Sequence, residues 1–135
     1  MSHKVVFING CFDVLHRGHL ELFEFARSHG SHLVVALDTD ERVAANKGPD
    51  RPFNNLKDRK KMVSSIKTVD WVEQFGSDEE LVSLVRQWSP AVMVVGSDWR
   101  NKKIIGSEFA KEVKFFERID GYSTTKILQN SVDRR

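Results

Sequence analysis

The sequence predicts an α/β fold in which five parallel strands form a doubly wound sheet. Five short runs of apolar residues, rich in β-branched side chains, alternate along the 135 residues with segments of helical periodicity. Strands that are apolar throughout are typical of parallel sheets that helices cover on both faces. We expect the strand order 3-2-1-4-5, in which the first and fourth strands are neighbours and the chain reverses direction between them. Open α/β sheets bind their ligands at such a reversal.

Each element is placed by its periodicity and by the turn residues that bound it. Pro90 ends the fourth helical segment, and Gly30 is expected to close the first one as a C-cap. Asp38 or Thr39 is the natural N-cap of the second. The predicted strands are residues 4–8, 32–37, 71–75, 91–95 and 114–116. The predicted helices are residues 20–27, 41–45, 56–66 and 78–88, with a last helix that begins at Ser123. The whole arrangement is Rossmann-like.

Length and composition indicate one domain that spans residues 1–135, with 40% hydrophobic residues to fill a single core. The formal charge of +2 is small and the basic residues are scattered, which argues against a nucleic-acid partner. One cysteine permits no internal disulfide and is consistent with a reducing compartment. No signal-peptide pattern precedes the first strand and no apolar run reaches transmembrane length. We therefore expect a cytoplasmic protein without membrane contact.

The turn after the first strand carries two histidines, His16 and His19, with Gly18 between them. A strand, a glycine turn and a helix N-terminus in succession form an anion site, because unpaired backbone N–H groups and the positive end of the helix dipole point the same way. Two imidazoles there add further donors, so the pattern predicts a phosphate site. Solvated or capping histidines are the simpler alternative. Zinc ligands are another, although the spacing is not H-E-x-x-H and the cysteine, Cys11, lies within the turn.

A second irregular stretch, residues 46–55, contains two prolines and a glycine and is predicted to be a loop. Lys47 and Arg51 are its cations. Long loops in compact domains often cover a binding site, so this one is interpreted as a lid over a phosphate ligand. A solvated loop without a role is the alternative.

The stretch GCFDVLHRGH resembles the HxGH signature of the nucleotidyltransferase superfamily, in particular its cytidylyltransferase-like branch. The resemblance implies that His16 and His19 hold the triphosphate and stabilise the pentacovalent phosphorus. It also implies that the nucleotide contacts the turn around them. Cys11 stands where glycerol-3-phosphate cytidylyltransferases usually carry Thr, so a hydroxyl contact there is lost or replaced. The turn residues expected at the nucleotide are Gly10, Cys11, Phe12 and Gly18.

Residues 47–63, KGPDRPFNNLKDRKKMV, are similar to a segment of heptose-phosphate nucleotidyltransferases. This similarity implies that Lys47 acts at the triphosphate and that Arg59 lies near the acceptor substrate. Asp13 is also placed on the acceptor side of the site. The structural role for Asp13, a carboxylate that fixes a loop by accepting hydrogen bonds, is preferred over metal ligation.

Two further segments resemble cytidylyltransferases. RIDGYSTTK is similar to the signature R-T-E-G-I-S-T-T-K, which implies a catalytic Arg118 and phosphate contacts from Ser123 and Thr124 at a helix N-terminus. Without that context, Ser and Thr at a helix start are ordinary caps. GSDWRNK is similar to a G-D-D-W segment of the glycerol-3-phosphate enzymes. Its residues Gly96, Asp98 and Trp99 are therefore expected at the nucleotide, with Asp98 again fixing a loop rather than binding metal.

These resemblances imply an enzyme that joins a small phosphorylated polyol or sugar to the α-phosphate of a nucleoside triphosphate and releases pyrophosphate. Mg²⁺ is expected, held mainly by the nucleotide phosphates and not by a protein metal site. A homodimer is usual for such proteins. Trp99 and Arg118 favour CTP with glycerol 3-phosphate, whereas Cys11 and the KGPDRP segment favour ATP with heptose 1-phosphate. We predict CTP, with the heptose 1-phosphate adenylyltransferase as the alternative. A nucleotide-binding module without catalysis is a third hypothesis, although no G-x-G-x-x-G follows the first strand.

Overall fold

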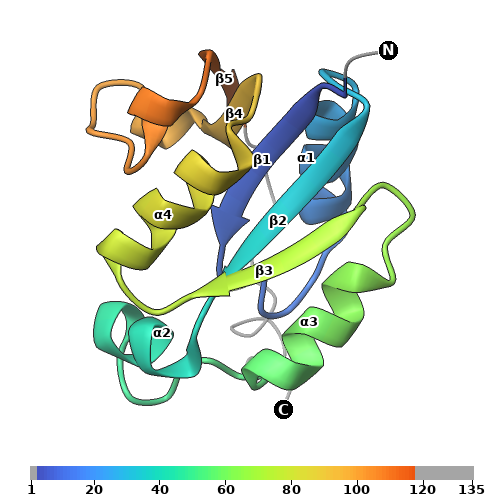
Figure 1. The fold of residues 1–135 in the computed structure, drawn as a ribbon. Coiled ribbons are helices and arrows are strands. Elements are labelled where there is room, and N and C mark those ends of the chain that lie inside the picture. The colour runs from blue at the N-terminus through green and yellow to red at the C-terminus, as the bar shows by residue number, and fades with distance from the viewer. Residues whose placement is uncertain (1–2, 118–135) are drawn as a thin grey trace.

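The computed structural model describes residues 3–117, which form a five-stranded parallel sheet with helices on both faces (Figure 1). The strand order is β3-β2-β1-β4-β5, and every neighbouring pair is parallel. The predicted fold class and strand order are therefore confirmed. The strands are β1 (Val5–Gly10), β2 (His32–Asp38), β3 (Trp71–Phe75), β4 (Val92–Gly96) and β5 (Glu112–Phe116). The helices are α1 (Arg17–Arg27), α2 (Asp40–Lys47), α3 (Leu56–Ser64) and α4 (Asp78–Trp88), with short 3₁₀ turns η1 (Ser97–Trp99) and η2 (Ser107–Phe109).

Side-chain alternation along β1 divides the core into two layers. Val6 and Ile8 pack in one cluster with Phe23 of α1 and Val63 of α3. Phe7, which points to the other face, packs with residues of α4 in a second cluster. Helices α1 and α3 therefore cover one face of the sheet and α4 covers the other, as Figure 1 shows.

The end of α1 differs from the prediction. Ser28 is the C-cap and has right-handed helical dihedral angles, so Gly30 does not cap the helix. Gly30 is required for a different reason. A Cβ atom at this position would lie 2.4 Å from the carbonyl oxygen of Lys4, which also accepts a hydrogen bond of 2.8 Å from Ser31 N. The glycine lets the turn pass close to the start of β1.

Helix α2 is longer than predicted, and this changes where Lys47 lies. Thr39 caps its N-terminus by accepting a hydrogen bond from Arg42 N. Gly48, with φ of 108°, ends the helix in a conformation that favours glycine. Asn46 and Lys47 thus belong to the last turn of α2, and only residues 48–55 form the irregular loop.

The candidate site lies where the carboxyl ends of β1, β2 and β4 meet. Val6 and Phe7 of β1 pair with residues of β4 on one side, and the whole of β1 pairs with β2 on the other. The predicted last helix, with Arg118, Ser123 and Thr124, falls outside the described residues. Among residues 3–117, no helix combines the length and the apolar character needed to cross a membrane.

Candidate active site

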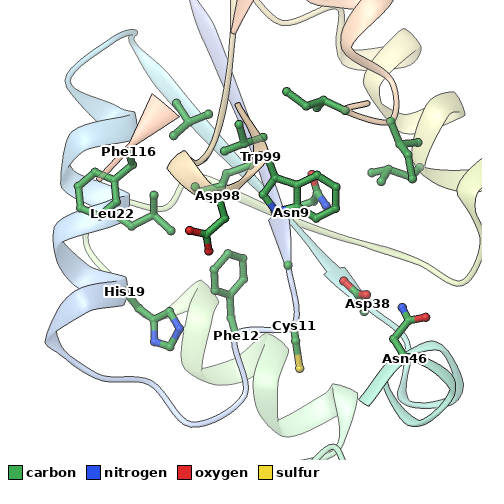
Figure 2. A pocket seen from close by; sticks show the side chains of 18 of the residues that line it. Asn9, Cys11, Phe12, His19, Leu22, Asp38, Asn46, Asp98, Trp99 and Phe116 are labelled. Atoms are coloured by element: carbon green, nitrogen blue, oxygen red, sulfur yellow. The ribbon is translucent and has the colours of Figure 1, made fainter. Parts of the chain in front are cut away.

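A cavity of about 560 Å³ opens at the carboxyl ends of β1, β2 and β4 (Figure 2). It brings together residues from three predicted segments: the histidine turn, the end of α2 and the turn after β4. The predicted site residues that line it are Gly10, Cys11, Phe12, His16, Gly18, His19, Lys47, Gly96, Asp98 and Trp99.

His16 and His19 form a reciprocal cap at the N-terminus of α1. His16 Nδ1 accepts a hydrogen bond of 3.0 Å from Gly18 N, and His19 Nδ1 accepts one of 3.1 Å from His16 N. The two rings stack with their centroids 3.9 Å apart. An Nδ1 atom that accepts from a backbone N–H cannot carry a proton, so each neutral ring carries its hydrogen on Nε2.

This cap corrects the expectation that an anion would bind unpaired backbone N–H groups here. The N–H groups of His16 and Gly18 already donate to the imidazoles. The N–H donor of each neutral ring is its Nε2–H. The histidines therefore both cap the helix and line the cavity, so the capping role and the phosphate-binding role are compatible.

Phe12 supports the ring of His19. It adopts a left-handed φ of 47° in the turn, a conformation that non-glycine residues rarely hold. Its ring makes edge-to-face contacts with His19 at 5.6 Å and with Phe23 at 5.1 Å between centroids. A Cβ atom on Gly10 would come within 3.0 Å of the Phe12 ring. Gly10 therefore makes room for the phenyl ring that orients His19.

Asp13 ties the histidine turn to the loop before α3. Its carboxylate accepts hydrogen bonds from the backbone N–H groups of Phe53 and Asn54, the latter at 2.7 Å. Arg51 Nε lies 3.8 Å from the same carboxylate. Asp13 is buried and is not among the residues that line the cavity. This geometry agrees with the predicted loop-fixing role and places Asp13 behind the cavity wall.

Arg59 is also behind the wall, fully buried at 0% exposure. Its guanidinium donates to Asp40 Oδ1 at 2.7 Å, to the carbonyl of Cys11 at 3.0 Å and to the carbonyl of Asn54 at 3.0 Å. It is not among the cavity-lining residues. The structure thus does not bring Arg59 to the expected acceptor site. Instead, one side chain joins the histidine turn, α2 and the loop before α3.

Cys11 lines the cavity beside these segments. Burial raises the pKa of its thiol, although the nearby cations Lys47 and Arg59 act in the opposite direction. The raised pKa keeps the group protonated at neutral pH. It is a small, weakly polar part of the wall and not an activated nucleophile.

The β4 side of the cavity has an apolar wall and an aromatic rim. Gly96 ends β4, and the indole of Trp99 in η1 is 46% exposed. The ammonium group of Lys102 lies 5.5 Å from the centroid of the indole. Ile104, Ile105 and Phe116 complete this side. A partly exposed indole above apolar side chains suits a flat heteroaromatic ligand.

Comparison with known proteins decides the family. A family model described as cytidylyltransferase-like matches residues 7–130. The chain belongs to the cytidylyltransferase-like family. The predicted nucleotidyltransferase class is thereby confirmed.

Curated relatives of this chain include the bifunctional protein HldE of several bacteria. The chain is 43% identical to HldE of Sulfurimonas denitrificans over 126 residues, which is 93% of this chain and 26% of that protein. It is 42% identical to HldE of Helicobacter pylori strain J99 over 128 residues, 95% of this chain and 27% of that protein. The chain thus spans about a quarter of the length of the curated relatives it matches.

Solved structures share the fold of this chain at lower sequence identity than the HldE proteins. A lipopolysaccharide core biosynthesis protein from Thermoplasma volcanium matches with a TM-score of 0.71 and 22% identity, over 88% of this chain and 100% of that chain. Pantothenate synthetase from Thermus thermophilus matches with a TM-score of 0.57 and 16% identity, over 97% of this chain and 66% of that chain. Both similarities support the fold alone.

Sequence reasoning missed four polar residues that line the cavity of this cytidylyltransferase-like protein: Asn9, Asp38, Arg42 and Asn46. Asn9 and Asp38 lie at the carboxyl ends of β1 and β2, the edge where ligands bind in such sheets, and this position was the available signal. The sequence indicates Asp38 only as a helix cap. Arg42 lies within the predicted helix 41–45, where periodicity does not report which side chains face a cavity. Asn46 belongs to the last turn of α2, which extends farther than predicted.

Carboxylates at the cavity are dispersed. Asp38 is the last residue of β2 and Asp98 follows β4, on either side of the central strand β1. Within residues 3–117, no three His, Cys, Asp or Glu side chains gather as a metal site would require.

Proposed function

We propose that this protein transfers an adenylyl group from ATP to the phosphate of heptose 1-phosphate and releases pyrophosphate. The observation that carries the reaction type is the stacked His16 and His19 pair, which lines the same cavity as Lys47. Support for the substrate comes from the similarity to HldE proteins and from the resemblance of residues 47–63 to heptose-phosphate nucleotidyltransferases.

The reaction is an in-line displacement at the α-phosphorus. An oxygen of the acceptor phosphate forms the new P–O bond, and the bond to the bridging oxygen of the pyrophosphate breaks. The acceptor phosphate is ionised at neutral pH, so no general base is needed. Catalysis depends on positioning and on stabilising the charge that develops on the phosphate oxygens.

The residues of the cavity supply that charge stabilisation. Neutral His16 and His19 donate through Nε2–H, and Lys47 adds a full positive charge from the end of α2. By resemblance, Arg118, Ser123 and Thr124 hold the triphosphate as well. If Mg²⁺ arrives on the nucleotide phosphates, it would neutralise part of their charge, and the nucleotide itself would supply most of its oxygen ligands.

The layout of the cavity supports placing the nucleoside toward β4 and the acceptor toward α2. Trp99 and the apolar residues beside it suit a base. The α2 end is polar and carries the three cations Arg42, Lys47 and Arg51. Two phosphate-bearing substrates then meet between the histidines and Lys47. By analogy with the family, we also propose a homodimer.

The choice of ATP revises the sequence-based preference for CTP. That preference required a small, rigid pocket bounded by Trp99, which would exclude a purine by size. Trp99 instead lies on a 3₁₀ turn at the cavity rim and is 46% exposed, so it can stack on either type of base. Several HldE proteins match over most of the chain, and this supports ATP.

Pyrophosphate release tests the proposal. Each of ATP, CTP, GTP and UTP is offered with Mg²⁺ and either heptose 1-phosphate or glycerol 3-phosphate, and ATP and CTP are also mixed at equal concentration. We expect turnover with ATP and heptose 1-phosphate, and its loss in His16→Asn. Preference for CTP with glycerol 3-phosphate would restore the cytidylyltransferase prediction. Nucleotide binding without turnover on any acceptor would indicate a non-catalytic module.

A further inference from the structure

The α2 end of the cavity contains a carboxylate, Asp38, that the phosphate chemistry does not use. Asp38 is the last residue of β2, and Figure 2 shows it at the cavity together with Asn46 of α2 and Cys11. Its side chain is 16% exposed, so it is neither solvated nor sealed in the core. It belongs to the cavity wall.

Asp38 is held in place by an arginine that has other partners. Arg42 Nε lies 3.5 Å from Asp38 Oδ2, one helical turn along the chain. The same guanidinium donates to Asp78 Oδ1 at 2.7 Å and packs over the ring of Phe75 at 5.2 Å. Asp78 already balances the charge of Arg42, so Asp38 is not needed for that purpose.

A carboxylate at this position opposes the binding of phosphate. Lys47 and Arg42 line the same part of the cavity, and an anion beside them weakens their attraction for a polyanionic ligand. Burial also raises the pKa of Asp38 despite the opposing effect of Arg42, so the ionised side chain is costly to keep there. A carboxylate at this position is therefore better explained by a ligand group other than phosphate.

Hydroxyl groups meet this requirement. A carboxylate accepts hydrogen bonds strongly from hydroxyls, and a carboxamide both donates and accepts. Asp38 and Asn46, from different elements of the same wall, offer this combination next to the cations that attract a phosphate. A phosphorylated polyol or sugar presents both kinds of group on one small molecule.

We propose that Asp38, assisted by Asn46, binds hydroxyl groups of the acceptor and determines which phosphorylated polyol or sugar the enzyme selects. This inference rests on the proposed function. It adds the residue that recognises the hydroxyl groups of the acceptor. A site built to bond a hydroxyl discriminates strongly against an analogue that lacks it, because the partly buried carboxylate then loses that hydrogen bond.

The test compares heptose 1-phosphate with a set of its monodeoxy analogues, each with saturating ATP. Asp38→Ala should lower kcat/KM for heptose 1-phosphate by roughly 10- to 100-fold and leave the KM for ATP within about twofold, as expected for the loss of a charged hydrogen bond. Wild type should discriminate strongly against at least one deoxy analogue. The alanine variant should lose that discrimination, because neither acceptor then makes the bond.

Two further variants separate this role from a structural one. Asp38→Asn keeps the shape and one acceptor oxygen, so it should retain part of the discrimination. Asp78→Asn removes the exposed partner of Arg42 without touching the cavity and should match wild type on every acceptor. Circular dichroism confirms that each variant is folded.

Three results would overturn the inference. In the first, Asp38→Ala and wild type discriminate equally between heptose 1-phosphate and every deoxy analogue. In the second, Asp38→Ala raises the KM for ATP as much as the KM for the acceptor. Each of these leaves the proposed function intact. In the third, wild type releases no pyrophosphate with any acceptor, and the inference then fails together with the proposed function.

Discussion

His19 accepts, through Nδ1, a hydrogen bond of 3.1 Å from the backbone N–H of His16, while its ring stacks on the His16 ring. His16 in turn accepts from Gly18 N. The backbone of the helix start therefore sets the tautomer of both histidines, to which we assign the charge stabilisation. Substrate is not needed to orient them, and this is the type of preorganisation that charge-stabilising catalysis requires.

The tautomers can be measured directly. Since each Nδ1 accepts from an N–H group, neutral His16 and His19 should both carry hydrogen on Nε2. In ¹⁵N NMR spectra of the ligand-free protein at neutral pH, Nδ1 of both rings should show shifts of the unprotonated, pyridine-like type. His32 at the start of β2 is a suitable internal comparison. An Nδ1–H signal from either ring would contradict the reciprocal cap.

Substitution of His16 separates its two roles. Asn is a good helix N-cap and can accept from Gly18 N, but it lacks the Nε2–H donor. His16→Asn should therefore keep near wild-type stability and lose about two to four orders of magnitude in turnover. His16→Ala should lose similar turnover and also about 1 kcal/mol of stability. Steady-state kinetics and urea denaturation of both variants measure the two effects. Near-normal turnover of folded His16→Asn, or of folded His19→Ala, would remove the catalytic assignment.

The loop after α2 is expected to respond to nucleotide only in part. Asp13 accepts hydrogen bonds from the backbone N–H groups of Phe53 and Asn54, and Arg59 donates to the carbonyl of Asn54. These bonds anchor the second half of the loop. A lid motion is therefore restricted to residues 48–50, next to Lys47. Hydrogen exchange with and without saturating ATP should show protection at the backbone amides of Gly48 and Asp50, since Pro49 has none. Lys47→Ala should weaken ATP binding about 10-fold or more without lowering stability, since its side chain is exposed. Equal exchange in both states would exclude the lid.

Arg59 is predicted to affect stability and site geometry without contacting substrate. Arg59→Met leaves the carbonyls of Cys11 and Asn54 without their donor, and the free energy of unfolding should fall by about 2–4 kcal/mol. The cost is moderated because its carboxylate partner, Asp40, is 41% exposed. Urea denaturation measures the loss, with Lys61→Met on the exposed face of α3 as the control. A stability change below about 0.5 kcal/mol in Arg59→Met would show that the three-segment contact is unimportant.

Asp38 should make the free energy of unfolding depend on pH in the direction opposite to that given by an ordinary ion-paired carboxylate. Burial raises the pKa of Asp38, so the native state holds this proton to higher pH than the unfolded chain does. Its contribution to stability is therefore favourable at low pH. It is lost as the pH rises above about 4, the unfolded value, through the folded value. Asp38→Asn should be at least as stable as wild type at pH 7, and this advantage should disappear below pH 4. Urea denaturation at pH 7 and pH 3.5 checks the sign. A wild type more stable than Asp38→Asn at pH 7 would reverse it.

Local sequence determined the elements and their order. The apolar runs of β1, β2 and β4 cannot be solvated on either face, so they predict a covered parallel sheet, and the position of the HxGH turn after the first strand follows from that order. The residues of the histidine turn can also be identified from local sequence. His16, Gly18 and His19 are close in sequence, and short-range geometry fixes them.

Contacts between distant segments were decided only by the tertiary structure. Arg59 reads from the sequence as one of several cations on a polar helix, yet it is fully buried because Asp40, Cys11 and Asn54 converge on it from other elements. Asp38 reads as a helix cap, yet Thr39 caps α2, and the pairing of β2 with β1 places Asp38 on the cavity wall instead. Periodicity reports which face of an element is buried. It does not report which polar side chains from separate elements meet at one end of a sheet, because that depends on packing over the whole chain.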